Sequence, residues 1–195
     1  MSIQFLKAGT SDALVLNAIS KQAFESDVKV GAPSVGGPPG YMSLKYHMKM
    51  ARSGHLFKLT DDGLIVGGAV LFPDGDTLNI GRIFVNPDHY RKGYGTRMMQ
   101  EIEALFPEIK TFTLDTPVWN NRTNSFYRKL GYTEAKRNDE FVYYYKHRID
   151  MTIIEYVTDE FDCCSREDEV PDEEDIGNAA YCLIHDIPYG GFGGT

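Results

Sequence analysis

The stretch "VNPDHYRKGYGTRMMQEIEALF", residues 85–106, leads from an apolar strand through a basic glycine turn into an amphipathic helix. Apolar residues recur at helical spacing in its second half, namely Met98, Ile102, Leu105 and Phe106. A glycine-lined helix start exposes unpaired backbone N–H groups at the positive end of the helix dipole, where phosphates bind readily. Glycines serve ordinary turns far more often than they serve ligands, so this turn is a candidate phosphate site that needs a second indication.

Two well-known phosphate-binding motifs do not fit this turn. A P-loop requires the spacing GxxxxGK[ST], and the lysine and hydroxyl of that motif are missing here. A dinucleotide-binding turn is suggested by Asp115, at about the right distance downstream, but its third glycine would stand at Met98. In that motif the strand also leads straight into the first glycine, whereas residues 86–92 intervene here. The turn therefore belongs to neither motif.

The first 150 residues alternate between β-rich runs and helical periodicity, which is typical of an α/β domain. We predict strands over residues 3–7, 55–60, 64–72, 77–85, 110–116, 133–136 and 141–146. Besides the helix after the glycine turn, we predict helices over residues 11–24, 43–52 and 122–130. The turn signals "DDG" and "PDGD" join three of the strands into a meander. The two strands joined by the helix after the turn should lie parallel.

Length and charge favour one globular domain with an appendage. The chain has 195 residues, 42% of them hydrophobic, which is enough for one substantial core but short for two full domains. Residues 151–195 hold 12 acidic residues and one arginine, whereas residues 1–150 carry a net charge of +3. We therefore predict a domain over residues 1–150 and an acidic C-terminal extension over residues 151–195. The extension is either a loosely packed tail or docks on the domain or on a partner subunit.

Composition also argues against several partners and locations. The basic residues form no broad stripe, so we expect no nucleic-acid partner. No apolar window approaches the ~20 residues of a membrane span, and the N-terminus lacks the pattern of a secretory signal. We therefore expect a cytoplasmic protein without a membrane partner. The three cysteines include an adjacent pair and the five histidines show no ligand spacing, so we expect neither disulfides nor a metal site.

A second motif follows the glycine turn, N-x-R-T-x-x-F-Y-x-K-L-G-Y over residues 120–132. The order of strand, V-x-P, basic turn G-x-G-[ST], amphipathic helix, strand and this second motif resembles the GNAT superfamily of N-acetyltransferases, over roughly residues 3–147. The resemblance implies an α/β GNAT fold, in which helices flank a mixed, largely antiparallel sheet with splayed parallel central strands. It also implies acetyl-CoA as the co-substrate.

The resemblance further implies where acetyl-CoA would bind. Its pyrophosphate would lie on the backbone of the turn, at Arg91, Lys92, Gly93, Tyr94, Gly95 and Thr96. Tyr90 stands where the family usually has Gln or Arg, so the basic contact of that position is displaced or lost. The pantetheine arm would pair with the free edge of a bulged strand at Ile83, Phe84 and Val85, and would contact Asn120.

Catalytic roles follow from the same resemblance. Tyr127 matches the tyrosine that protonates the departing thiolate, while an amine attacks the thioester directly in a ternary complex. The positions that hold a basic residue in some family members are Asn79 and Gly81 here, and neither accepts a proton near pH 7. Asp115, at the end of the neighbouring strand, is then either the general base or a turn or capping carboxylate.

Acceptor specificity in this superfamily usually depends on the segment between the first two helices, which is Gly/Pro-rich here. Tyr41, Tyr46 and His47 are the candidate acceptor contacts, unless the Gly/Pro run only shapes a surface loop. We expect an acetyl-CoA-dependent N-acetyltransferase that acts on a primary amine of a small molecule, with a homodimer as a further option. The alternatives are a non-catalytic module that senses acetyl-CoA or CoA, and a protein N-acetyltransferase.

Overall fold

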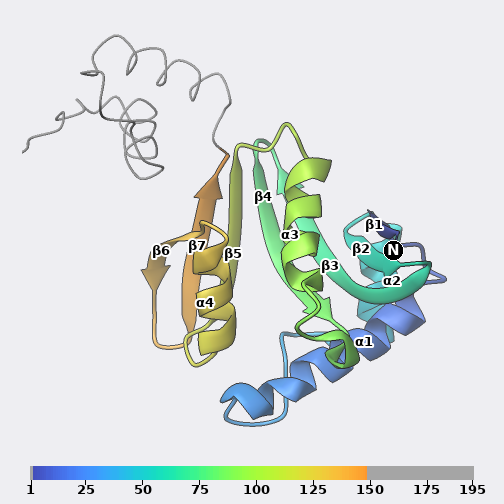
Figure 1. Ribbon diagram of the computed structural model, residues 1–195, viewed down its shortest axis with the longest axis horizontal. Helices are drawn as coiled ribbons and strands as arrows, with labels where there is room; N and C mark the ends of the chain where they lie inside the picture. Colours follow the sequence, from blue (N-terminus) through green and yellow to red (C-terminus); the bar gives the residue numbers. More distant parts are fainter. Residues whose placement is uncertain (1, 149–195) are drawn as a thin grey trace, which may run out of the picture. The chain divides into compact units, whose positions relative to one another are not determined.

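A computed structural model describes residues 2–148 (Figure 1), and the predicted acidic extension at residues 151–195 lies outside them. Seven strands form one sheet in the order β1-β2-β3-β4-β5-β7-β6. The strands are β1 (Ile3–Lys7), β2 (Leu56–Asp61), β3 (Leu64–Asp74), β4 (Thr77–Val85), β5 (Thr111–Pro117), β6 (Thr133–Arg137) and β7 (Phe141–His147). Only β4 and β5 pair in parallel, so the predicted mixed, largely antiparallel sheet is confirmed for the described residues.

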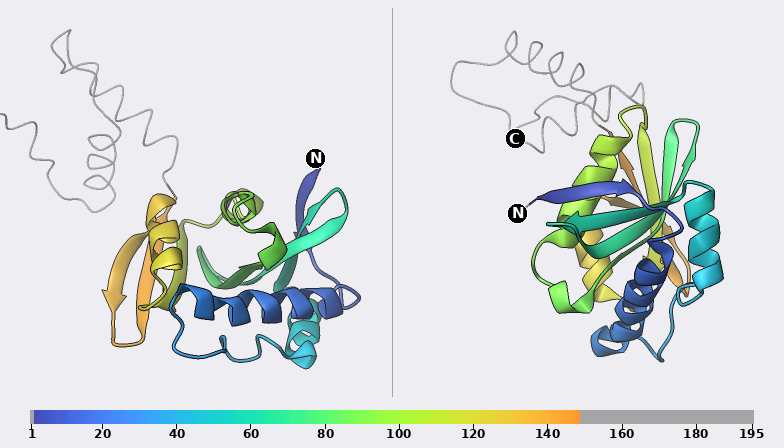
Figure 2. Two further views of the ribbon diagram at one scale, coloured as in Figure 1. Left: turned by 60° about the horizontal axis from the view of Figure 1, so that its bottom comes forward. Right: turned by 90° about the vertical axis from the view of Figure 1, so that its right-hand side faces the viewer.

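Helices cover both faces of this sheet (Figure 2). They are α1 (Ala13–Glu25), α2 (Leu44–Arg52), α3 (Tyr94–Leu105) and α4 (Asn121–Lys129), with the 3-10 helices η1 (Ser26–Val30) and η2 (Pro87–His89). Side chains of α1 and α2 pack on one face, and those of α3 and α4 pack on the other. The predicted strands and α-helices are all present, with their ends shifted by at most two residues, whereas the 3-10 helices η1 and η2 were not predicted. None of the helices within residues 2–148 is both long enough and apolar enough to cross a membrane.

The sheet separates two apolar clusters. The larger one lies beneath α3 and α4 and includes Met98 and Ile102, two residues of the predicted helical stripe. The smaller one lies beneath α1 and α2 and includes Leu16 and Phe84. Leu105 was expected in the same stripe as Met98, but it is 44% exposed because it is the last residue of α3. Burial of the two clusters fixes both layers of helices against the sheet.

The two parallel strands pair only over a short length. The ladder between β4 and β5 ends at the pair Asn79 and Thr113, and the two strands diverge beyond it (Figure 1). The Nδ2 of Asn79 donates to Oγ1 of Thr113 at 3.2 Å at this last pair. The splay of the central strands that the sequence predicted is therefore present, and it leaves a gap between the C-terminal halves of β4 and β5.

A bulge in β4 accompanies this divergence. After the pair of Val70 with Arg82, the next residue of β3 opposes Ile80, so Gly81 is the extra residue. A Cβ at Gly81 would come within 2.6 Å of the Phe72 ring, which explains why a residue without a side chain stands there. Because of this extra residue, the side chains of Arg82 and of the residues after it leave β4 on the opposite faces of the sheet from those that a regular strand would give them.

Candidate active site

The divergence leaves one edge of β4 unpaired. Just after β4, the N–H of Asn86 donates to the carbonyl of Val66 at 2.8 Å. Counting back from Asn86, every second residue of β4 therefore turns its N–H and C=O groups towards β3 in this antiparallel ladder. Phe84 is one of these residues, and its ring lies in the cluster beneath α1 and α2. Ile83 and Val85 alternate with it and direct their peptide groups into the gap. Of the three predicted residues, Ile83 and Val85 thus have the backbone orientation for pairing with an extended ligand.

The glycine turn ends in unpaired N–H groups at the start of α3. Gly93 precedes the helix with a φ of 81°, and Arg91, which is not a glycine, also has a positive φ of 63°. The N–H of Arg97 donates to the carbonyl of Gly93 at 2.9 Å and begins the helical ladder. The preceding N–H groups, which have no intrahelical acceptor, are those of Tyr94, Gly95 and Thr96. Left-handed residues beside a helix start form a concave backbone site that suits an anion.

Two side chains of the turn, those of Tyr94 and Lys92, lie towards β1 and β2. Tyr94 is buried and donates to Asp61 at 2.5 Å, which anchors α3 to β2 and raises the pKa of Tyr94. Lys92 lines a hollow of about 360 Å³ together with Ser2 and Ile3 at the start of the described chain. The turn therefore offers its backbone to a ligand, while the side chains of Lys92 and Tyr94 face β1 and β2.

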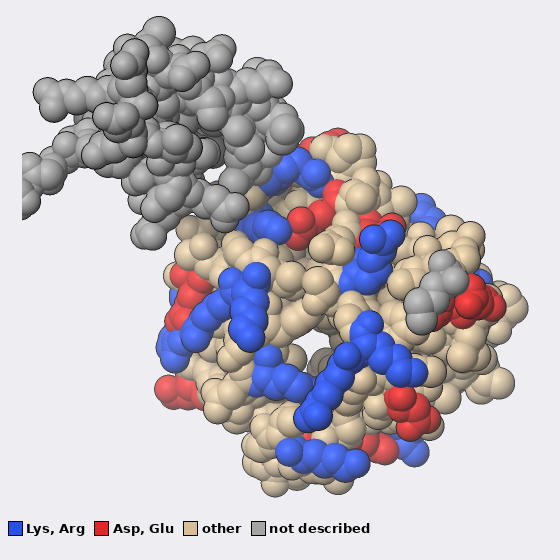
Figure 3. Space-filling view, viewed as in Figure 1, with Lys and Arg blue, Asp and Glu red and all other residues tan. Residues whose placement is uncertain are grey.

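A basic surface surrounds the opening between α3 and α4. Figure 3 shows Lys and Arg residues gathered around this opening. The turn and the first turns of both helices carry four exposed basic residues, Arg91, Lys92, Arg97 and Arg122, of which Lys92 and Arg97 line the hollow beside β1. A polyanionic ligand that enters between the two helices would meet a favourable potential there.

Asn120 closes the N-terminus of α4. Its side chain is 2% exposed, and its Oδ1 accepts from the N–H of Thr123 at 3.2 Å, which is the usual role of an N-cap asparagine. Its Nδ2 donates to Oδ2 of Asp27 at 3.4 Å. The residue predicted to contact acetyl-CoA therefore also orients α4 and reaches towards η1.

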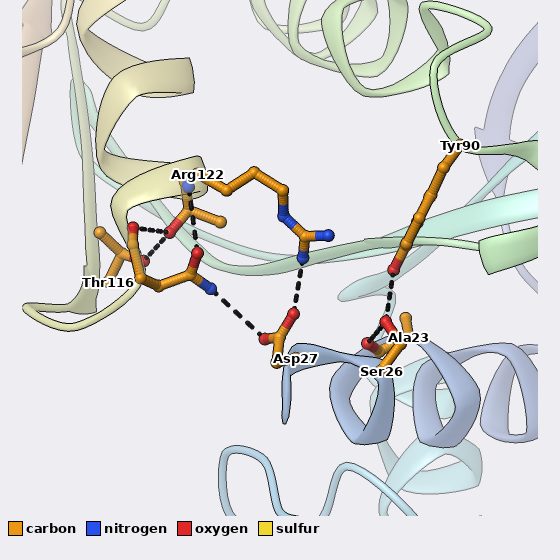
Figure 4. Close-up of polar contacts among 8 residues, drawn as sticks. Ala23, Ser26, Asp27, Tyr90, Thr116 and Arg122 are labelled. Carbon is orange, nitrogen blue, oxygen red and sulfur yellow. Dashed lines mark hydrogen bonds and ion pairs between the residues drawn. The ribbon is translucent and has the colours of Figure 1, made fainter. Parts of the chain in front are cut away.

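An ion pair joins α4 to η1 (Figure 4). Arg122 Nη2 lies 2.6 Å from Asp27 Oδ1, and the guanidinium lies 5.2 Å from the centre of the Tyr90 ring. The hydroxyl of Tyr90 is in turn 3.1 Å from Oγ of Ser26. Burial raises the pKa of Asp27, and the charge of Arg122 opposes this rise. The structure thus places a guanidinium from α4 over Tyr90, at the position where the sequence predicted a displaced or lost basic contact.

Tyr127 and Asp115 approach the gap from opposite faces of the sheet. Tyr127 is 7% exposed and packs with Tyr132 and Tyr144, with ring centres 5.9 and 6.1 Å away. Burial raises the pKa of Tyr127, and the negative charge of Asp115 raises it further. The side chain of Asp115 is exposed on the other face of β5, although partial desolvation of its carboxyl raises its pKa. The predicted acid and base therefore lie within electrostatic range of one another.

The three predicted acceptor residues differ in their surroundings. Tyr41 is half-buried and packs edge-on against Phe24 with ring centres 6.0 Å apart. Tyr46 is also half-buried and lies under the guanidinium of Arg82, 4.5 Å from its ring centre. His47 is completely buried, and burial lowers its pKa. Tyr41 and Tyr46 thus line the surface between α1 and α2, whereas His47 belongs to the interior.

Asn124 is a structural residue of the site that the sequence did not reveal. Its Nδ2 donates to the carbonyls of Pro117 and Asn120 at 3.0 and 2.8 Å, and its Oδ1 accepts from the Tyr144 hydroxyl at 2.9 Å. It therefore ties the end of β5 to α4 and β7. The second motif treats this position as variable, and a buried asparagine inside a helix has no periodicity that would single it out.

Comparison with known proteins agrees with this architecture. Residues 52–134 match the family model of the acetyltransferase (GNAT) domain. The UPF0039 protein C11D3.02c of Schizosaccharomyces pombe is 34% identical over 89 residues, which cover 43% of this chain and 57% of that protein. The match thus spans little more than half the length of this relative.

Solved structures of acetyltransferases share the fold. The PaiA N-acetyltransferase of Thermoplasma acidophilum, in complex with coenzyme A, superposes with a TM-score of 0.65 at 16% identity, over 76% of this chain and all of that chain. A GNAT family acetyltransferase of Listeria monocytogenes superposes with a TM-score of 0.63 at 16% identity, over 75% of this chain and 95% of that one. The predicted GNAT fold is confirmed for the described residues, and residues 52–134 are similar to the acetyltransferase (GNAT) domain.

Proposed function

We propose that the protein is an acetyl-CoA-dependent N-acetyltransferase that transfers an acetyl group to a primary amine of a small molecule. The observation that carries this proposal is the gap between β4 and β5, which opens at the end of the sheet where α3 and α4 both begin (Figure 1). The peptide groups of Ile83 and Val85 suit the amides of a pantetheine arm, and the N–H groups at the start of α3 suit its pyrophosphate.

The residues around the gap are arranged for direct transfer. As the amine nitrogen forms its bond to the thioester carbonyl carbon, the N–H of Ile83 or Val85 would stabilise the oxygen that gains charge. Tyr127 holds its proton tightly because burial raises its pKa, and it would donate this proton to the departing sulfur as the C–S bond breaks. Asp115 would accept the proton that the amine loses, directly or through a water molecule. One proton passes from the nitrogen to Asp115 and one from Tyr127 to the sulfur, and proton exchange with solvent then returns Asp115 to the carboxylate and Tyr127 to the phenol.

The class of acceptor is part of the proposal. Proteins of similar fold include a polyamine N-acetyltransferase of Drosophila melanogaster and the ribosomal-protein-S18-alanine N-acetyltransferase of Escherichia coli. The fold thus accommodates small amines in one protein and a protein amine in another. We propose a small-molecule acceptor because Tyr46, a candidate acceptor contact, lies under the guanidinium of Arg82 on the β4 side of the gap.

A panel of amines with acetyl-CoA, read out as release of free CoA thiol, tests the proposal. We expect turnover of small primary amines, and we expect Tyr127→Phe to lower kcat by roughly 100-fold or more without weakening acetyl-CoA binding. Tyr132→Phe is the matched control, because its hydroxyl is buried without a hydrogen-bond partner among the described residues and lies beside Tyr127. This control should retain activity close to that of the wild type.

The alternatives give different results in the same assay. Tight binding of acetyl-CoA without turnover of any amine, and no effect of Tyr127→Phe, would instead support a non-catalytic sensor module. Turnover of peptides but of no small amine would support a protein N-acetyltransferase. Activity of Tyr127→Phe equal to that of Tyr132→Phe would remove the assigned role of general acid.

A further inference from the structure

Arg82 faces the side of the gap opposite to α3 and α4. Phe84 lies two residues further along β4 and packs in the cluster beneath α1 and α2, so Arg82 leaves the strand on that same face. Asp115 leaves β5 on this face as well, because its neighbour Leu114 is buried in the cluster on the other face. An acceptor that reaches the gap from this face would pass between the guanidinium of Arg82 and the carboxylate of Asp115.

The guanidinium of Arg82 has no acidic partner among residues 2–148. Its Nη2 donates to the carbonyl of Pro39 at 3.0 Å, and its plane lies over the ring of Tyr46. The other two nitrogens, Nε and Nη1, are buried without a hydrogen-bond partner in this part of the chain. A desolvated cation costs free energy unless an anion compensates it. A buried cation without a compensating anion beside a gap is typical of groups that bind a ligand.

His47 does not neutralise the arginine. Its Nδ1 donates to the carbonyl of Ser43 at 2.9 Å, so Nε2 is the acceptor nitrogen of a neutral ring. This Nε2 is also buried and unpartnered within the described residues. Burial and the nearby charge of Arg82 both lower the pKa of His47. A carbonyl, an aromatic ring and a neutral imidazole therefore surround Arg82, and none of them supplies a negative charge.

We propose that Arg82 binds a carboxylate of the acceptor, so that the acceptor is an amino-carboxylic acid rather than a simple amine. This inference rests on the proposed N-acetyltransferase function. A guanidinium presents a planar fork of N–H donors that matches a carboxylate with two parallel hydrogen bonds. The carboxylate would take the place of the Pro39 carbonyl at Nη2 and would pair one of the buried nitrogens. The amine of the same molecule would then lie in the gap, on the side of Asp115.

Matched pairs of acceptors test this inference through the rate of CoA release. Each pair consists of an ω-amino acid and the alkylamine of equal length, and a further pair compares phosphoethanolamine with ethanolamine. The wild type should prefer the carboxylate member by roughly 10- to 100-fold in kcat/KM, because the alkylamine lacks the charged group that would accept hydrogen bonds from Arg82. Arg82→Gln should abolish this preference, because its KM for the carboxylate member of each pair rises to that of the matching alkylamine.

Two further variants complete the experiment. Arg52→Gln removes an exposed arginine at the end of α2 and should keep the full preference. Arg82→Lys keeps the positive charge but lacks the planar guanidinium, so it should keep only part of the preference for the carboxylate member. This variant tests the inference even if Arg82→Gln does not fold. Three results would overturn the inference and leave the acetyltransferase proposal standing. They are equal turnover of both members of each pair, an undiminished carboxylate preference in Arg82→Gln and Arg82→Lys, and a preference for the phosphate compound alone. Failure to turn over any amine would overturn both.

Discussion

Asn124→Ala should destabilise the domain by about 3 kcal/mol, because it removes three hydrogen bonds at one buried position. A hydrogen bond between neutral groups contributes about 1 kcal/mol net, and a buried group left without a partner costs about 1 to 3 kcal/mol. The Tyr144 hydroxyl is such a group, since that residue is buried in the larger cluster. Alanine recovers about 0.5 kcal/mol of helix propensity relative to asparagine, which offsets only part of the loss.

Urea unfolding of the full chain, followed by far-UV circular dichroism, measures this change in the free energy of unfolding. Tyr144→Phe removes one of the three bonds and should cost about 1 kcal/mol. The double variant should lose less than the sum of the single losses, because both variants break the same bond. Asn121→Ala changes an exposed asparagine of the same helix and should alter the stability by less than about 0.5 kcal/mol. A loss below 1 kcal/mol for Asn124→Ala, or one equal to that of Asn121→Ala, would refute the reasoning.

Three more predictions concern the turn and the gap. Gly93→Ala should lower the free energy of unfolding by about 1 kcal/mol, because Gly93 has a φ of 81°, and it should also weaken acetyl-CoA binding measured by calorimetry. Gly75 has a φ of 58° in the hairpin between β3 and β4, so Gly75→Ala should lower the free energy of unfolding equally and leave acetyl-CoA binding unchanged. Asp115 has a raised folded-state pKa, so the stability it contributes is present below pH 3.8 and is lost as the pH rises through the folded pKa. Asp115→Asn should remove that decline in a pH series of urea unfolding, and parallel profiles of variant and wild type would contradict it. Tyr132→Phe removes a buried hydroxyl that has no partner within residues 2–148, so its free energy of unfolding should equal or exceed that of the wild type, and a loss above 1 kcal/mol would show that the hydroxyl has a partner.

The elements of the fold could be predicted closely because each is encoded by its own short stretch. The strand over Thr77–Val85 was predicted with its observed bounds, since its apolar run is enclosed by turn residues on one side and a proline-containing connector on the other. The start of α3 followed from glycines before an apolar stripe. The splay of β4 and β5 came from the resemblance carried by two motifs, and the ladder between the strands confirms it.

The contacts between elements could not be predicted in the same way. The ion pair between Asp27 and Arg122 joins residues 95 positions apart, and neither residue's local sequence indicates the other. His47 was a candidate acceptor contact, and the packing of α2 on β4 buries it completely. Such outcomes depend on how the layers pack, because burial of a polar residue is decided by the elements that cover it.

By itself, the sequence determined which segments become strands and helices, where a candidate phosphate-binding turn lies and which superfamily the chain resembles. Hydrophobic periodicity, turn residues and motif order carry this information within a few tens of residues. Only the tertiary structure decided which backbone groups face the gap and which charges lack a partner. The register of β3 and β4 turns the peptide groups of Ile83 and Val85 towards the gap, and the bulge at Gly81 directs Arg82 to the face opposite α3 and α4, without an acidic neighbour among the described residues. These properties arise when separate strands and helices come together, because partnering and desolvation are relations between segments that are distant in the sequence.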